Sequence, residues 1–139
     1  GRMILPHFER LLNICNIQGW QEGHKTLTCD RDGFVTILTE MLKAAPFDEE
    51  WYLERYPDVA QAVENGEFVS AREHYVRFGY FEGRLPGLNG FDFRAYCALY
   101  SDLADILFEP GSDGKAKAHF IEYGYREGRF APDKAEAEA

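Results

Sequence analysis

The sequence predicts an all-α fold, in which two short-helix repeats of about 40 residues pack with an N-terminal helical pair. The prediction depends on similarity between residues 47–84 and 91–129, on helix-capping residues within each copy, and on apolar side chains at helical spacing in residues 1–46. These observations divide the chain into a helical head (1–46), tandem repeats (47–130) and a tail (131–139). The tail is small and charged, so we expect it to be flexible.

The repeat is marked by identities that follow one another in the same order in both copies. The first parts of the copies align at an offset of 44 residues and the second parts at 45, because the loop between them gains one residue. The thirteen identical positions are, in the first copy, Phe47, Asp48, Tyr52, Tyr56, Asp58, Ala60, Ala71, His74, Gly79, Tyr80, Glu82, Gly83 and Arg84. Such self-similarity is typical of repeat architectures, in which neighbouring units bury a continuous core.

Capping residues predict three short helices in the first copy. Asp48 suits the N-cap of the first helix, and Pro57 ends that helix and begins the second. Ser70 and Glu73 form a capping box for the third helix, and Gly79 stands where a left-handed C-terminal cap is expected.

The second copy has weaker signals at the same places. Ser101 replaces the proline, and Ser112 or Asp113 can cap a helix that is expected to end at Gly124. We still expect the same three helices, because the apolar pattern is retained.

Two helices are predicted in the head. A first helix is expected after Pro6, and its apolar positions are Phe8, Leu11, Leu12 and Cys15. A second helix is predicted by six positions at helical spacing, which are Phe34, Ile37, Leu38, Met41, Leu42 and Ala45. The alternative is a β-hairpin that pairs residues 25–29 with 34–38. We favour the helix, because six periodic positions outweigh one turn signal.

Composition excludes several classes of partner. The chain of 139 residues is 45% hydrophobic and 28% charged, which is typical of a globular protein, and its net charge is −9. The head has five Lys or Arg and five Asp or Glu, so residues 47–139 carry the whole net charge. An acidic chain binds phosphate backbones poorly, which argues against nucleic acid. No apolar run is long enough to span a membrane.

The motif F-D-x3-Y-L-x3-P-D-V, followed by H-Y-x3-G-x2-E-G-R, is complete in the first copy at residues 47–59 and 74–84. The second copy departs from it at Cys97, Ser101, Leu103 and Phe120 in ways that keep helix and core plausible. Residues 47–130 therefore resemble a tandem helical repeat found beside bacterial glycosyltransferase and polysaccharide-biosynthesis domains and in large surface proteins of the calcium-binding type. The resemblance implies an accessory module rather than an enzyme.

The cysteines bear on location. Cys15, Cys29 and Cys97 are odd in number and widely spaced, so we expect reduced thiols rather than disulfides or a zinc site. With the bacterial resemblance, this favours a cytoplasmic location. Gly1 and Arg2 before Met3 are typical of a cloning remnant, and a trimmed signal would make the protein secreted or surface-associated instead.

Polar residues that recur in both copies are candidate interaction residues. They are His74 and His119, Glu82 and Arg84, and Glu127 and Arg129. The histidines would share a ligand or, as we favour, bond to a neighbouring loop, since no other His or Cys recurs with them. The Glu–Arg pairs would form an anion site or, as we favour, tie the turn after each third helix to helix ends or to the neighbouring repeat.

An aromatic set gives the main alternative partner. Its members are Trp51, Tyr52, Tyr56, Tyr80, Tyr96, Tyr100 and Tyr125. Aromatic rings flanked by carboxylates suit a saccharide-binding face, whereas aromatics at helical spacing more often fill a core, and we favour the core. Trp51 and Tyr80 are expected to be the most exposed, and with Tyr125 they join the candidate interaction residues.

Two acidic patterns are explained without a site. Residues 30–33 resemble part of a calcium loop, but Thr28 and Thr39 stand where ligands are needed, and we favour a turn that caps the next helix. Asp58 and Asp102 could be paired catalytic carboxylates, but each lies in the first turn of a helix, where the helix dipole accounts for it. No metal, cofactor or catalytic residue is therefore expected.

We predict a non-catalytic protein-interaction or scaffolding module, accessory to cell-surface polysaccharide or glycosyltransferase machinery. Its partner would be another protein or a second copy of itself. The alternative is a saccharide-binding domain that uses exposed Trp, Tyr and carboxylates. An enzyme that uses the Asp, Glu and His residues of the repeats is the least favoured.

Overall fold

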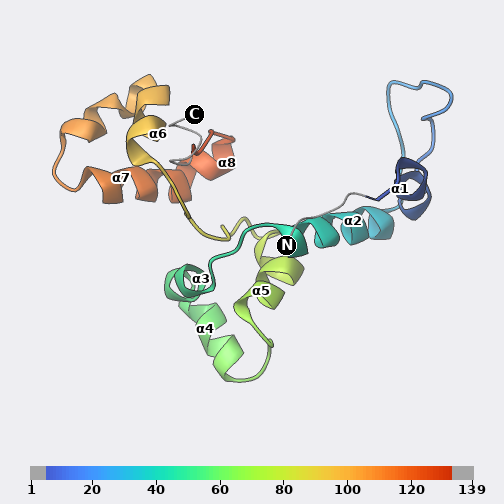
Figure 1. The fold of residues 1–139 in the computed structure, drawn as a ribbon, viewed down its shortest axis with the longest axis horizontal. Helices are drawn as coiled ribbons and strands as arrows, with labels where there is room; N and C mark the ends of the chain where they lie inside the picture. The colour runs from blue at the N-terminus through green and yellow to red at the C-terminus, as the bar shows by residue number, and fades with distance from the viewer. Residues whose placement is uncertain (1–5, 133–139) are drawn as a thin grey trace.

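The computed structural model describes residues 6–132, which are helical with no strand, so the all-α prediction is confirmed over this part of the chain (Figure 1). The elements are α1 (Phe8–Ile14), α2 (Arg31–Ala44), α3 (Glu49–Arg55), α4 (Pro57–Glu64), α5 (Ala71–His74), the π-helical turn η1 (Tyr75–Gly79), α6 (Phe93–Leu99), the 3-10 helix η2 (Ser101–Phe108), α7 (Ser112–His119), the π-helical turn η3 (Phe120–Gly124) and α8 (Tyr125–Glu127). A lone antiparallel bridge joins Gln18 to Thr28 in the head loop. Residues 133–139 of the expected tail lie outside the described part.

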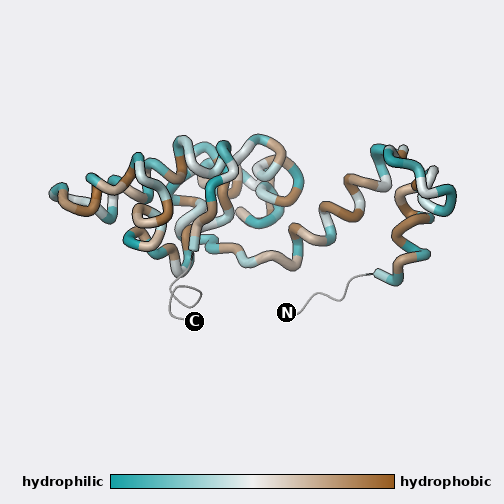
Figure 2. The backbone as a smooth tube through the Cα atoms, turned by 90° about the horizontal axis from the view of Figure 1, so that it is seen from above, coloured by the Kyte–Doolittle hydropathy of each residue, from teal (hydrophilic) through white to brown (hydrophobic). Residues whose placement is uncertain are grey.

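The molecule is elongated, with the repeats at one end and the head at the other. Figure 1 shows α3–α5 and α6–α8 as two neighbouring lobes, while α2 leads away from them to α1. Figure 2 shows the same extension from above, with apolar residues along α2 between the lobes and the head. The helix α2 therefore connects the two parts, and its Leu42 belongs to the core of the first repeat.

The first repeat closes around its own core. The core residues are Leu42, Tyr52, Val59, Ala71, Tyr75 and Val76. Asp48 caps α3 by accepting a bond from the Trp51 amide at 3.1 Å, and Pro57 is the first residue of α4. The Asp48 amide donates to the carbonyl of Pro86 at 2.9 Å, which joins the start of the repeat to its end.

The second repeat is built in the same way. Its core residues are Leu85, Phe91, Tyr96, Cys97, Leu103, Ala116 and Phe120. Asp92 caps α6 through the Ala95 amide at 3.0 Å, and its own amide donates to the carbonyl of Pro132 at 3.0 Å. Trp51 packs against both cores and so links the repeats.

Three details of the repeats differ from the sequence-based expectations. Gly79 is not a left-handed cap but lies inside η1, and the left-handed glycine is Gly83, at φ 83°. The second copy has a 3-10 helix that begins at Ser101 where the first has α4, which begins at Pro57. Neither Ser112 nor Asp113 caps α7, because the helix begins at Ser112 and Gly111 holds the N-cap position.

The head contains the two expected helices, and α2 replaces the alternative hairpin. Asp30 takes the N-cap position of α2 without a side-chain capping bond. Its carboxylate instead accepts a bond from the Asn16 side chain at 3.4 Å. Residues 30–33 thus lie at the start of a helix, but the Asp30 side chain does not cap it as expected.

Candidate functional site

Each repeat holds a tyrosine–histidine pair between its first and third helices. The Tyr52 hydroxyl lies 2.8 Å from Nδ1 of His74, and the Tyr96 hydroxyl lies 2.8 Å from Nδ1 of His119. Burial raises the pKa of Tyr52 and raises that of Tyr96 to about 12, so both phenols stay protonated at neutral pH. The histidines are thus held by buried tyrosines, at equivalent places in the two repeats.

His74 is the more buried of the two histidines. Burial, and next the nearby Arg84 guanidinium, hold the pKa of His74 below its usual value. Its Nε2 lies 3.8 Å from the Glu82 carboxylate, which favours the tautomer with hydrogen on Nε2 and leaves Nδ1 to accept from Tyr52. The geometry therefore gives His74 a structural role, as a neutral imidazole that is hydrogen-bonded to Tyr52 inside the first repeat.

A glycine makes room for each tyrosine hydroxyl. A Cβ at Gly79 would collide with the Tyr52 hydroxyl, and one at Gly124 would collide with the Tyr96 hydroxyl. Both glycines lie in π-helical turns and neither has a positive φ. These glycines therefore recur because the tyrosine approaches the backbone closely, not because of their conformational freedom.

The recurring arginines form bidentate ion pairs within their own repeat. Arg84 donates to both carboxylate oxygens of Asp58, at 2.9 and 2.8 Å, and its guanidinium lies 4.9 Å from the centre of the Tyr56 ring. Glu82 adds a contact at 3.5 Å. The hydrogen bonds from Arg84 hold the pKa of Asp58 below its usual value.

The second repeat has the same arrangement. Arg129 donates to both oxygens of Asp102 at 2.9 Å, lies 4.7 Å from the Tyr100 ring centre and contacts Glu127 at 3.1 Å. Its hydrogen bonds hold the pKa of Asp102 below the usual value. Asp58 and Asp102 are thus each committed to an arginine, rather than set facing one another as paired acids.

Two further tyrosines of the set, Tyr56 and Tyr100, tie the end of each repeat to the start of its second helix. The Tyr56 hydroxyl accepts from the Leu85 amide at 3.0 Å, and the Tyr100 hydroxyl accepts from the Phe130 amide at 2.6 Å. Among the described residues, no buried side-chain nitrogen or oxygen lacks a partner. The buried polar side chains in the described part of the repeats are therefore satisfied within the fold.

Trp51, Tyr80 and Tyr125 are half-buried. Trp51 packs against both cores, Tyr80 against the first and Tyr125 against the second. Tyr125 also lines a shallow cavity of about 320 Å³ together with residues of both repeats, among them Tyr75 and Phe120. The structure thus places these three aromatics around the junction of the repeats.

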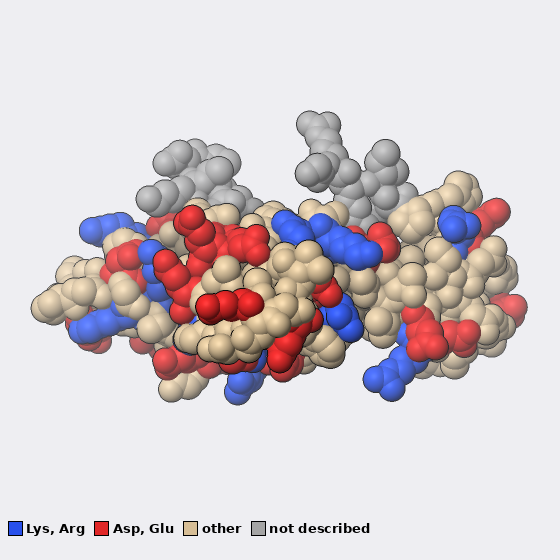
Figure 3. Space-filling view, turned by 90° about the horizontal axis from the view of Figure 1, so that it is seen from below, with Lys and Arg blue, Asp and Glu red and all other residues tan. Residues whose placement is uncertain are grey.

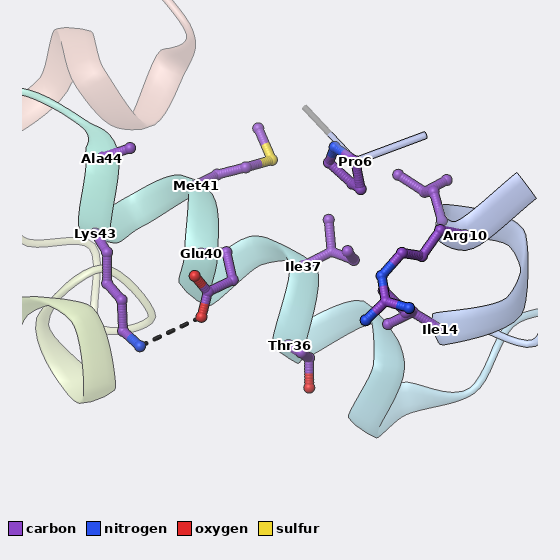
Figure 4. A pocket seen from close by; sticks show the side chains of 10 residues that line it. Pro6, Arg10, Ile14, Thr36, Ile37, Glu40, Met41, Lys43 and Ala44 are labelled. Carbon is purple, nitrogen blue, oxygen red and sulfur yellow. Dashed lines mark hydrogen bonds and ion pairs between the residues drawn. The ribbon is translucent and has the colours of Figure 1, made fainter. Parts of the chain in front are cut away.

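A hollow in the head involves none of the residues that recur in the two repeats. The helices α1 and α2 approach at Gly33, where a Cβ would collide with the Ile14 carbonyl, and beyond this point a groove of about 540 Å³ separates them (Figure 4). Its apolar lining is formed by Pro6, Leu11, Ile14, Ile37, Met41 and Ala44. Its polar lining residues are Arg10, Thr36, Glu40 and Lys43.

The feature of the sequence that indicates this groove is the wide stripe of apolar side chains on α2. Because α1 has only 7 residues, it cannot cover every apolar position of the stripe on α2. No residue of α1 is buried, and only Gly33 and Leu42 are buried in α2. Leu42 belongs to the core of the first repeat, so the head has almost no core of its own.

Charge separates the head from the repeats. On the face in Figure 3, acidic side chains spread over the repeats, whereas the head shows a broad uncharged surface with a few charges of both signs. This agrees with the sequence, in which residues 1–46 are neutral and the rest carries the charge of −9. The groove thus opens on a neutral, apolar part of an acidic molecule.

In the described part of the chain, no helix has the length and apolar character that crossing a membrane requires. In comparisons with known proteins, no family model, curated protein or solved structure matches the chain.

Proposed function

We propose that the chain is a non-catalytic protein-interaction module whose head groove receives an apolar helical surface of a protein partner. The observation that carries the proposal is the groove between α1 and α2, with its apolar lining and its rim of Arg10, Glu40 and Lys43. Helix-in-groove recognition uses this combination of an apolar floor and a polar rim. The resemblance of the repeats supports a setting beside cell-surface polysaccharide or glycosyltransferase machinery.

The repeats serve as the rigid base in this proposal. Arg84 and Arg129 are engaged in internal bonds, as are four of the tyrosines, Tyr52, Tyr56, Tyr96 and Tyr100, and Tyr52 and Tyr96 are 0% exposed. A saccharide-binding face needs aromatic rings open to solvent, so the groove supports a protein partner better than the repeats support a sugar. The same internal bonds give no support to an enzyme built on Asp58, Asp102 or the histidines.

Affinity capture with variants tests the proposal. The full chain and a Met41→Asp variant are used to capture proteins from bacterial extract, with a glycan array run in parallel. Met41 lines the groove and is 45% exposed, so an aspartate there adds charge to the groove without entering a core. We expect the parent chain to capture protein, including its own kind or glycosyltransferase-associated proteins, and Met41→Asp to lose it.

The matched control is Phe108→Asp, which makes the same kind of change at the end of η2, where Phe108 is 87% exposed and far from the groove in sequence. It is expected to capture protein as the parent does. Equal capture by all three chains, or glycan binding without protein capture, would contradict the proposal.

A further inference from the structure

We propose that the occupant of the head groove is the same groove-forming hairpin of a second copy, so that two chains join head to head in a four-helix bundle of two α1 and two α2 helices. This inference rests on the proposed function and names its partner. Three observations carry it: the missing core of the head, the charge of its rim, and its position in the molecule.

The first observation is that the hairpin is incomplete as a packing unit. Helices of 7 and 14 residues gain little stability on their own, and most of their stability must come from burying an apolar face. Ile37 is only half-buried and Met41 is 45% exposed, although both follow the apolar period of α2. A second hairpin placed on this face supplies the missing half of a bundle core.

The second observation is that the rim of the groove has both signs of charge, with a cation on α1 and an anion beside a second cation on α2. Arg10 lies on α1 and Glu40 lies on α2, where its carboxylate also accepts from Lys43 at 3.3 Å (Figure 4). A twofold axis along the groove sets α1 of each copy against α2 of the other. Arg10 of each copy then faces Glu40 of its partner, so the surface complements itself.

The third observation is the position of the head. The acidic repeats lie at one end of the elongated molecule and the neutral head at the other (Figures 1 and 2). Two copies that met through their repeats would bring like charges together, which disfavours association. Two copies that meet through their heads keep the acidic repeats apart.

A charge-swap experiment on the full chain tests the inference. The parent is expected to sediment at twice its chain mass of 16.0 kDa at micromolar concentration. In Arg10→Glu alone, or Glu40→Arg alone, both symmetric ion pairs become like-charge contacts, so we expect the dimer dissociation constant to rise roughly tenfold. Mixing the two variants restores opposite charges at both contacts, so the mixture is expected to form a heterodimer with near-parental affinity.

Arg94→Glu and Glu122→Arg make the same charge changes on exposed positions of the second repeat and are expected to leave the dimer unchanged. Circular dichroism checks that every variant keeps its helices. A parent that stays monomeric up to about 100 μM would overturn the inference, as would a dimer that none of the head variants weakens. If a monomeric parent still captures another protein in a Met41-dependent way, the dimer fails and the proposed function stands.

Discussion

The tyrosine–histidine pair is the smallest unit that explains the repeat. Tyr52 is 0% exposed, its hydroxyl lies 2.8 Å from His74, and a glycine at position 79 leaves space for that hydroxyl. The same three residue types recur at Tyr96, His119 and Gly124, and the bond length is again 2.8 Å. The recurrence of these three residue types is therefore explained by how they pack together, without a shared ligand.

A double-mutant cycle tests this packing. Gly79→Ala brings a methyl group against the Tyr52 hydroxyl and is expected to lower the free energy of unfolding by about 1–3 kcal/mol. Tyr52→Phe removes the hydroxyl and leaves His74 without its partner, at a similar cost of about 1–3 kcal/mol. In the double variant the next ring atom lies at an ordinary 3.4 Å, so the combined loss is expected to be smaller than the sum.

The second repeat provides the comparison for this cycle. At Gly124, a Cβ would still meet Phe120 at 3.0 Å and the Tyr96 ring at 3.2 Å after the hydroxyl is removed. Tyr96→Phe should therefore rescue Gly124→Ala less completely than Tyr52→Phe rescues Gly79→Ala. Urea unfolding measures all of these values, and strictly additive losses in both repeats would refute the packing argument.

The lowered pKa of His74 predicts how stability depends on pH. Because the folded state disfavours the imidazolium, the unfolded chain binds more protons as the pH falls below about 6.5. Stability contributed by neutral His74 is present above that pH and is lost as the pH falls through the lower folded value. Asp58 and Asp102, whose pKa values are also lowered, lose their contribution only below about 3.9.

Urea unfolding at pH 7.5 and 5.5 separates these two windows. The parent should be less stable at pH 5.5, while His74→Gln should lose most of this difference because it has no imidazole to protonate. A variant that keeps the full difference would show that another group causes it.

At the scale of the elements, the sequence correctly predicts features that depend only on residues close together in the chain. Asp48 caps α3, Pro57 begins α4, and the Ser70 side chain accepts from the Glu73 amide at 3.1 Å. The function of Gly79 could not be predicted, because it depends on a tyrosine of a different helix. The groove was missed for a similar reason: periodicity shows that α2 has an apolar stripe but not how much of it α1 leaves uncovered.

The bidentate arginine–aspartate pairs also lead to a prediction at the scale of the elements. Arg84→Lys keeps the charge but loses the bidentate geometry toward Asp58 and the contact with the Tyr56 ring. Asp58 is largely exposed to solvent, so we expect a loss of only about 1 kcal/mol in the free energy of unfolding.

The matched control is Arg77→Lys. Arg77 pairs with Glu73 on the helix surface at 3.1 Å and should cost no more than about 0.5 kcal/mol. Thermal and urea unfolding compare the two variants. If both variants lost the same free energy of unfolding, the bidentate pair between Arg84 and Asp58 would contribute no more to stability than the surface pair of Arg77.

At the scale of the whole molecule, the chain has two different parts joined by α2. Leu42 anchors the C-terminal half of α2 in the first repeat, while Ile37 and Met41 face the head groove. Each repeat has a buried core and a bidentate arginine–aspartate pair, whereas the head has an apolar groove and no net charge. This contrast underlies our proposal that the repeats stabilise the chain and that the head binds the partner.

Photo-crosslinking tests this central claim most directly. A photoreactive amino acid is placed at Met41 in the groove or at Phe108 on the second repeat, both of which have exposed side chains, and the full chain is irradiated in bacterial cells. The mass of each adduct shows whether a protein was captured and whether it is a second copy. We expect protein adducts from position 41 and none from position 108. Adducts from position 108 with none from position 41 would contradict the assignment of recognition to the head.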